Sequence, residues 1–284
     1  MEKYSRLRDG VQQLPSIQML EPLGATDTQL LYAHSPAYVQ AVIYGTLSAQ
    51  EQNEIGFPWS LQMVERSRRS VGATIAACQS ACTEGVSVNL AGGTHHAYRD
   101  KGSGFCVFND AAVAARVLQK EHPSVRQILI VDLDVHQGNG TASILQTDDS
   151  IFTFSMHGEK NFPFRKESSN LDVPLPDGCD DATYLKALEQ SLNHIEQSFR
   201  PDFIIYLAGA DPHIDDRLGR LSLTDAGMLC RDQTILDFAE HHKIPVALSM
   251  AGGYGRNIDT TVSIHLQTVR CALSMQHALQ AALI

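Results

Sequence analysis

Five short runs of apolar residues, each followed at once by a polar or glycine-rich cluster, constrain this chain of 284 residues more than any other feature. The runs are rich in Val, Ile, Leu and Phe and show little polar alternation, which is typical of central parallel strands covered on both faces. We expect strands at Val86–Leu90, Gln127–Val135, Ile151–Ser155, Phe203–Leu207 and Pro245–Met250. Ligands of such open sheets bind beyond the carboxyl ends of the strands, where all five clusters would meet.

Helical segments separate these runs, as the crossovers of a parallel sheet require. Ser35 and Pro36 supply an N-cap and a first-turn proline for a helix that runs to Gly45. We expect further helices at Leu61–Cys82, Asp110–Glu121, Ala182–Phe199, Thr224–His242 (with Ser222 as a candidate cap) and Thr260–Leu283. The alternation predicts an α/β fold, with a mostly parallel central sheet and helices on both faces. No linker or repeat interrupts it, so we expect a single domain over residues 1–284.

Charge and cysteine content restrict the environment of the chain. A net charge of −10 gives no general electrostatic footprint for nucleic acid, and it favours cationic partners such as lysine-rich tails or polyamines. The six cysteines form no Cys-x-x-Cys pair. No apolar run approaches the roughly 18 residues of a membrane span, and the polar start does not resemble a signal peptide. We therefore expect a cytoplasmic protein with no direct nucleic-acid binding and no membrane span.

The cluster at residues 132–136, of sequence DLDVH, carries the strongest chemical signal. Side chains alternate along a strand, so Asp132, Asp134 and His136 are expected on one face. Burying two carboxylates beside an imidazole calls for a divalent cation, although a metal-free hydrogen-bond network and a structural role for Asp132 remain alternatives. Asp211, after the fourth apolar run, offers a further ligand. Two aspartates and one histidine leave an open coordination position, as catalytic metal sites do.

Three more clusters suggest acid–base groups and pocket walls. His95 and His96 lie just past a strand end, where imidazoles that titrate near neutral pH suit proton transfer; a surface or metal-binding pair is the alternative. Tyr254 follows two glycines, and its hydroxyl can donate to a developing oxyanion, although this motif alone favours a packing tyrosine. Phe105, in a glycine-rich loop, and Phe162 are candidate walls of a pocket or ordinary loop anchors.

Taken in order, these clusters resemble the motifs of the histone deacetylase superfamily, which has the arginase-like fold. The resemblance extends over nearly the whole chain, and the neutral Gln137 and Asn139 are most similar to class IV and its bacterial relatives. The matching motifs are Gly92-Gly93-Thr94-His95-His96-Ala97, Gly104-Phe105-Cys106 with Asn109-Asp110, Asp132-x-Asp134-x-His136, Gly209-Ala210-Asp211 and Gly252-Gly253-Tyr254. The resemblance implies a single deacetylase-like catalytic domain over residues 1–284.

For the reacting centre, the resemblance implies a metal site and four groups around it. The metal is expected to be zinc, with iron(II) as the alternative, because the same ligands hold either ion. The other groups are a tandem acid–base pair of histidines, an aspartate that orients the first of them, and a tyrosine that hydrogen-bonds the substrate carbonyl. They are Asp134, His136 and Asp211 for the metal, and His95, His96, Asp132 and Tyr254 for catalysis.

Around that centre, the resemblance implies a substrate tunnel and two supporting residues. Gly104 and Phe105 match the wall that grips the aliphatic stem of an acyl-lysine, and Phe162 is the candidate for the opposing wall. Asn139 is neutral where class I enzymes carry a charge, which favours the second histidine of the pair as the base. Ser155 falls where the family often holds a structural potassium ion.

The predicted activity is hydrolysis of the amide of an N-acyl lysine, acetyl-lysine first, by water that the metal activates. Acetylated polyamines and small acetylated metabolites fit the same chemistry, and a non-catalytic acyl-amine binding protein is the alternative of a different class. An arginase-like enzyme with two manganese ions is disfavoured, since Gly138 stands where it would need a carboxylate. None of these motifs encodes the oligomeric state.

Overall fold

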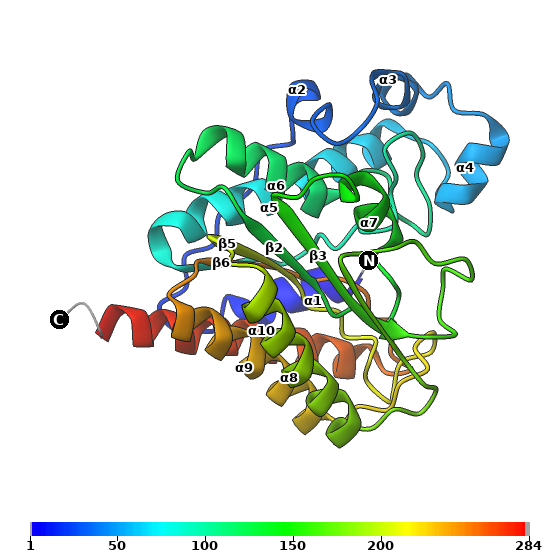
Figure 1. Cartoon of the computed structure of the whole chain (residues 1–284). Coiled ribbons are helices and arrows are strands. Elements are labelled where there is room, and N and C mark those ends of the chain that lie inside the picture. The colour runs from blue at the N-terminus through cyan, green and yellow to red at the C-terminus, as the bar shows by residue number, and fades with distance from the viewer. Residues whose placement is uncertain (1, 282–284) are drawn as a thin grey trace.

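The computed structural model describes residues 2–281 and shows a six-stranded sheet between two layers of helices (Figure 1). All neighbouring strands of this sheet are parallel, and their order is β1-β6-β5-β2-β3-β4. The strands are β1 (Val86–Asn89), β2 (Ile128–Asp132), β3 (Ile151–Gly158), β4 (Leu171–Leu175), β5 (Phe203–Leu207) and β6 (Val246–Ser249). The expected α/β fold, with a mostly parallel sheet and helices on both faces, is confirmed.

The helices of the described range form one layer on each face of the sheet (Figure 1). One layer contains α2 (Asp27–Leu30), α3 (Pro36–Tyr44), α4 (Ala49–Ile55), α5 (Leu61–Glu84), α6 (Asp110–Glu121) and α7 (Asn139–Leu145). The other contains α1 (Glu2–Val11), α8 (Asp181–Ser198), α9 (Asp225–His242) and α10 (Ile258–Ala281). Ile128 and Ile130 of β2 pack into one buried cluster, while Leu129 and Val131 pack into the other. This two-sided burial explains why the strands appear as unbroken apolar runs.

Local capping signals place several helix ends where the sequence predicts them. Ser35 caps α3 by accepting a hydrogen bond from the Tyr38 amide, and Gly45 ends that helix in the left-handed region. The prediction that Ser222 caps α9 is wrong, because Thr224 accepts from the Gly227 amide. The last helix begins at Ile258, and the final residues predicted for it, 282–283, lie outside the described range.

The second apolar run corrects one step of the sequence argument. The strand ends at Asp132 and not at Val135, so Asp134 and His136 do not share a strand face with Asp132. Beyond Asp132 the carboxylates take over as acceptors for the backbone: Asp132 accepts from the Asp134 amide, and Asp134 accepts from the His136 amide. These local bonds accompany the last backbone bonds to the neighbouring strands, from the Leu133 amide to Leu207 and from the Gly158 amide to Val135, and the chain bends beyond Asp132.

Two further features complete the fold. An edge strand, β4, pairs with β3 and was not expected from the sequence. The six cysteines are free, and no helix of residues 2–281 is long and apolar enough to cross a membrane.

Candidate metal and catalytic site

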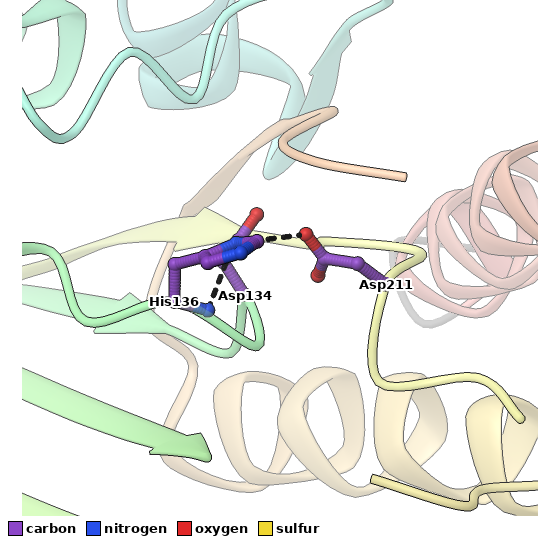
Figure 2. Close-up of side chains that lie close together, drawn as sticks. All are labelled: Asp134, His136 and Asp211. Carbon is purple, nitrogen blue, oxygen red and sulfur yellow. Dashed lines mark hydrogen bonds and ion pairs between the residues drawn. The ribbon is translucent and has the colours of Figure 1, made fainter. Parts of the chain in front are cut away.

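Asp134, His136 and Asp211 converge just beyond the carboxyl ends of β2 and β5 (Figure 2). Their ligand atoms all lie within 4.8 Å of one another. His136 Nδ1 is 3.0 Å from Asp134 Oδ1 and 3.3 Å from Asp211 Oδ2. Both aspartates are buried, whereas the His136 side chain retains 16% of its exposure. The imidazole therefore lies on the open side of the cluster.

Backbone groups from neighbouring loops hold the two carboxylates in place. The Val135 amide donates to Asp211 Oδ1, and the Gly252 amide donates to Asp134 Oδ2. A Cβ at position 252 would lie 1.9 Å from Asp211 Oδ2 and 2.6 Å from Asp134 Oδ2. Only glycine can bring its backbone this close, so the first glycine of the Gly-Gly-Tyr cluster is required by the packing of the two aspartates.

The donor set fits a divalent metal ion. Asp211 Oδ2 is buried and accepts no hydrogen bond from the described residues, so a ligand atom is left for another partner. Burial and the charge of Asp134 raise the pKa of Asp211 to about 7. Burial lowers the pKa of His136, but its close contacts with the carboxylates of Asp134 and Asp211 outweigh burial and raise the pKa to about 10. A cation bound between these groups displaces such protons, and an imidazole with two carboxylates suits zinc and iron(II) alike.

His95 and His96 lie beside this cluster, and their ring centroids are 4.1 Å apart. His95 Nδ1 is 2.6 Å from Asp132 Oδ2, and His96 Nδ1 is 2.6 Å from Asn139 Oδ1. An amide oxygen only accepts, so Nδ1 of His96 carries the proton and Nε2 of the neutral ring is left as an acceptor. The two histidines thus have the partners that the sequence predicts.

Their surroundings shift the pKa values of the two histidines in opposite directions. Burial lowers the pKa of His95, but the charges of Asp132 and Asp134 outweigh it and raise the pKa to about 9. Burial also lowers the pKa of His96, and there the positive charges of His95 and His136 add to it, so the pKa falls well below its ordinary value. The dipeptide therefore presents one charged and one neutral imidazole.

Tyr254 lies at the edge of the site, on a turn whose backbone is held by hydrogen bonds with two other side chains. Its ring is partly open, with 45% of its surface exposed. Its amide donates to Asp216 Oδ2 at 2.6 Å. On the other side, Lys3 Nζ donates to the carbonyls of Ala251 (3.3 Å) and Gly253 (3.2 Å). The sequence analysis missed both Lys3 and Asp216; the position of Asp216, five residues after the proposed ligand Asp211, is the one signal that could have found it.

Gly104 and Phe162 line the approach to His96. The Phe162 ring stands perpendicular to the His96 ring at 4.9 Å, and a Cβ at position 104 would lie 2.7 Å from His96 Cδ2. Phe105 is 53% exposed and packs against Phe57, so it lies farther from the histidines. A cavity of about 400 Å³ is lined by residues 53–56, 101, 103–105 and 162. The candidate wall residues therefore gather around one opening.

Ser155 lies at the carboxyl-end side of the sheet, next to a residue of the proposed site. It lies beside Asp132 in the register of β2 and β3, and its hydroxyl is 3.0 Å from His157 Nδ1. The potassium ion expected near it stays a prediction.

Comparison with known proteins identifies the family. A model of the histone deacetylase domain matches residues 1–269. The chain belongs to the histone deacetylase family. It is 45% identical to an uncharacterized protein of Picosynechococcus sp. over 266 residues, 94% of this chain and 88% of that one. It is 30% identical to histone deacetylase 2 of Arabidopsis thaliana, covering 83% of this chain and 63% of that protein. It is 31% identical to the acetoin utilization protein AcuC of Staphylococcus aureus, covering 73% and 58%.

Solved structures of this family have the same fold. A histone deacetylase homologue from Aquifex aeolicus superposes with a TM-score of 0.81 at 24% identity, over 95% of this chain and 77% of that one. A homologue complexed with SAHA gives the same TM-score at 25% identity and the same coverage. The resemblance based on motifs is thereby confirmed, and family membership supports deacetylase, and so hydrolase, activity. The chain spans about six tenths of the length of the named Arabidopsis and Staphylococcus relatives.

Proposed function

We propose that this histone deacetylase family protein is a metal-dependent deacylase that hydrolyses the amide of an N-acyl lysine, with acetyl as the acyl group. The observation that carries the proposal is the meeting of the Asp134–His136–Asp211 cluster with a charged and a neutral histidine at one sheet edge. A homologue complexed with SAHA supports an acyl-lysine-like chain as the ligand of this site. We further propose a class IV-like enzyme, with one catalytic domain over residues 1–284, that acts in a reducing cytoplasm.

Asp134, His136 and Asp211 would hold the metal, for which we propose zinc, with iron(II) as the alternative. When bound, such an ion supplies Lewis acidity toward the substrate carbonyl and lowers the pKa of water. Asp211 Oδ2, which lacks a hydrogen bond, and the partly open His136 ring support this placement.

His96 is proposed as the general base. It is neutral, and its Nε2 is free to accept because Nδ1 carries the proton and donates it in a hydrogen bond to Asn139 Oδ1. Water gives a proton to this nitrogen as its oxygen attacks the amide carbon. The charged His95 ring beside it disfavours keeping that proton, so His96 passes it to the departing amine. The C–N bond then breaks, giving a carboxylic acid and an amine, and the proton of the acid passes to the amine, so that the products leave as a carboxylate and an ammonium ion.

Asp132 and Tyr254 assist this sequence from opposite sides. Asp132 accepts a hydrogen bond from His95 and keeps it charged, which stabilises the negative charge that develops at the carbonyl oxygen. The Tyr254 hydroxyl is proposed to donate a hydrogen bond to the same oxygen, as an oxyanion-hole donor. Gly104 and Phe162 would contact the acyl-lysine stem, with Phe105 at the rim.

The test is turnover on a panel of fluorogenic lysines that carry acetyl, trifluoroacetyl, octanoyl or myristoyl groups, with and without a chelator. Two variants, Tyr254→Phe and Asp211→Ala, remove the proposed donor and a ligand. Two matched controls are Tyr184→Phe, at a buried hydroxyl with no hydrogen-bond partner, and Asp149→Ala, at an exposed carboxylate. We expect the native protein and the two control variants to turn over substrate. Chelation and each of the two site variants should abolish this turnover.

Other outcomes select among the alternatives. Turnover of acetylated polyamines or small acetylated metabolites, but of no acyl-lysine, would change the proposed substrate and leave the proposed reaction unchanged. One bound metal ion per chain with no turnover on either group would refute catalysis and leave a non-catalytic acyl-amine binding protein. Profiles of kcat against pH for His95→Ala and His96→Ala test the choice of base, because only loss of the base should remove the acid limb.

A further inference from the structure

Arg231 and Asp232, adjacent on α9, form an ion pair in the interior of the protein. Their side chains are 0% and 1% exposed, and Arg231 is among the largest fully buried side chains of the described residues. Arg231 Nε and Nη2 both donate to Asp232 Oδ1, at 2.9 and 2.7 Å. Replacing a buried ion pair by apolar residues often leaves stability unchanged or higher, so stability alone gives a weak reason for this pair.

The remaining nitrogen of Arg231 points to the loops that carry the proposed metal ligands. Its Nη1 donates to the Gly209 carbonyl at 2.5 Å and lies 3.5 Å from the Leu133 carbonyl. The Leu133 carbonyl belongs to the peptide that joins Leu133 to Asp134. The Gly209 carbonyl lies two residues before Asp211. One guanidinium therefore contacts the backbone just ahead of both aspartate ligands.

Asp232 fixes the orientation of that guanidinium. Its Oδ1 accepts from the Tyr206 hydroxyl of β5, and its Oδ2 accepts from the Thr268 hydroxyl of α10, both at 2.6 Å. The carboxylate is thus held by a strand and a helix on either side of α9. Because the Asp232 carboxylate is fixed and binds Nε and Nη2 of Arg231, the remaining Nη1 points toward the loops that carry the proposed metal ligands.

Gly209 transmits this contact to both aspartates. A Cβ at position 209 would lie 2.7 Å from Asp211 Oδ1, 2.8 Å from Asp134 Cα and 2.9 Å from Asp134 Oδ2. Its backbone is therefore packed against both ligand residues. A displacement of the Gly209 peptide would move one or both carboxylates.

We propose that Arg231 and Asp232 are a positioning pair for the metal site. The pair contacts neither substrate nor metal, and it acts by fixing the Leu133 and Gly209 carbonyls so that Asp134 and Asp211 are preorganised. This inference rests on the proposed metal dependence. Partners that orient metal ligands from behind typically change metal affinity by about 10- to 100-fold when they are removed.

The test is the zinc dissociation constant, measured by competition with a chromophoric chelator at fixed pH. The main variant is the double substitution Arg231→Met with Asp232→Asn, which removes both charges together. Thr268→Val is a milder variant that removes one anchor of Asp232, and it serves if the double variant does not fold. Ile235→Ala, one turn further along α9 and fully buried, is the control for lost packing.

We expect zinc affinity to fall at least about tenfold in the double variant, within the range for such supporting residues, and to fall by a smaller factor in Thr268→Val, which removes only one anchor of Asp232. Arg231→Lys keeps the positive charge but loses the planar guanidinium, so its zinc affinity should lie between that of the double variant and that of the native protein. Ile235→Ala should lower the melting temperature and leave the zinc dissociation constant unchanged.

Two results would overturn the positioning role: unchanged zinc affinity in folded double and Thr268→Val variants, or an equal loss of affinity in Ile235→Ala. A native protein that binds no zinc would overturn the metal site and the positioning pair together. A native protein that binds zinc but hydrolyses no acyl amine would refute only the proposed catalysis, and weakened zinc binding in the variants would still support the pair.

Discussion

Replacing Lys3 with methionine gives a direct test of how the turn that carries Tyr254 is held. Lys3 is 8% exposed, and its Nζ donates to the carbonyls of Ala251 and Gly253. The same nitrogen lies 5.2 Å from the centre of the Tyr254 ring. Burial lowers the pKa of Lys3, and the charge of Asp211 is the largest opposing influence. Methionine keeps the length of the side chain but removes the charge and the donors.

The size of the effect follows from those contacts. A hydrogen bond to a charged group contributes about 1.5–3 kcal/mol, and losing the donor also leaves two buried carbonyls without a partner. If that amount is lost from the orientation of Tyr254 in the transition state, kcat/KM falls roughly 10- to 150-fold, since about 1.36 kcal/mol corresponds to a factor of ten. The loss should appear mainly in kcat, because the hydroxyl acts on a charge that develops only during the reaction.

A double-mutant cycle with Tyr254→Phe separates this role from a general loss of stability. If Lys3 acts through Tyr254, Lys3→Met should cost no more than about twofold in the Tyr254→Phe background, the usual limit of additivity. Val11→Ala, in the apolar cluster that docks the same helix, controls for loosening of α1. Equal losses from Lys3→Met in both backgrounds, or an equal loss in Val11→Ala, would falsify the reasoning.

Three other perturbations test the site from different directions. Gly252→Ala would place a Cβ 1.9 Å from Asp211 Oδ2, so we expect no stoichiometric metal by elemental analysis; a normal metal content would contradict the packing argument. The pKa of His95 is raised to about 9, so activity that needs its charge should hold below that pH and fall as the pH rises through it. Asp132→Asn should shift this alkaline limb of kcat/KM to lower pH, and an unmoved limb would exclude His95 as its source. Chelation should lower the melting temperature, because a metal at 100 times its dissociation constant stabilises the folded state by about 2.7 kcal/mol; equal melting curves would count against a bound ion.

The convergence of the site residues could be predicted because it depends on topology more than on detail. Buried parallel strands produce unbroken apolar runs, and their carboxyl ends meet at one edge whatever the exact strand length. The prediction therefore placed Asp134 near Asp211 correctly although it extended β2 to Val135, beyond its end at Asp132. The pairing of His95 with Asp132 was implied by the resemblance to the family, and the structure brings the two side chains together.

The features that were missed lack a local pattern. The edge strand β4 is only five residues long and contains Pro174, which argues against a strand in a sequence-based prediction, so the alternation of Leu171, Val173 and Leu175 was passed over. Lys3 contacts backbone carbonyls 248 and 250 residues away. A backbone carbonyl is present at every residue, so the sequence around it does not mark it as a partner of Lys3. The Arg231–Asp232 pair reads as an ordinary charged stretch of an exposed helix face until tertiary packing buries it. Contacts between side chains and distant carbonyls depend on the tertiary structure, which cannot be predicted from a short stretch of sequence.

Protons offset part of the negative charge of the buried carboxylates at the proposed metal site when no ion is bound. In the metal-free protein, His136 holds a proton because its pKa is raised to about 10, and Asp211 shares one near neutral pH because its pKa is raised to about 7. A divalent cation displaces the proton of His136 and any proton on Asp211, so metal binding releases protons and strengthens as the pH rises. His95 remains paired with Asp132 throughout, since its partner lies outside the ligand set. Selectivity for a doubly charged ion then follows from the protein itself: a monovalent ion would leave one buried negative charge unpaired, and burial makes such a charge costly.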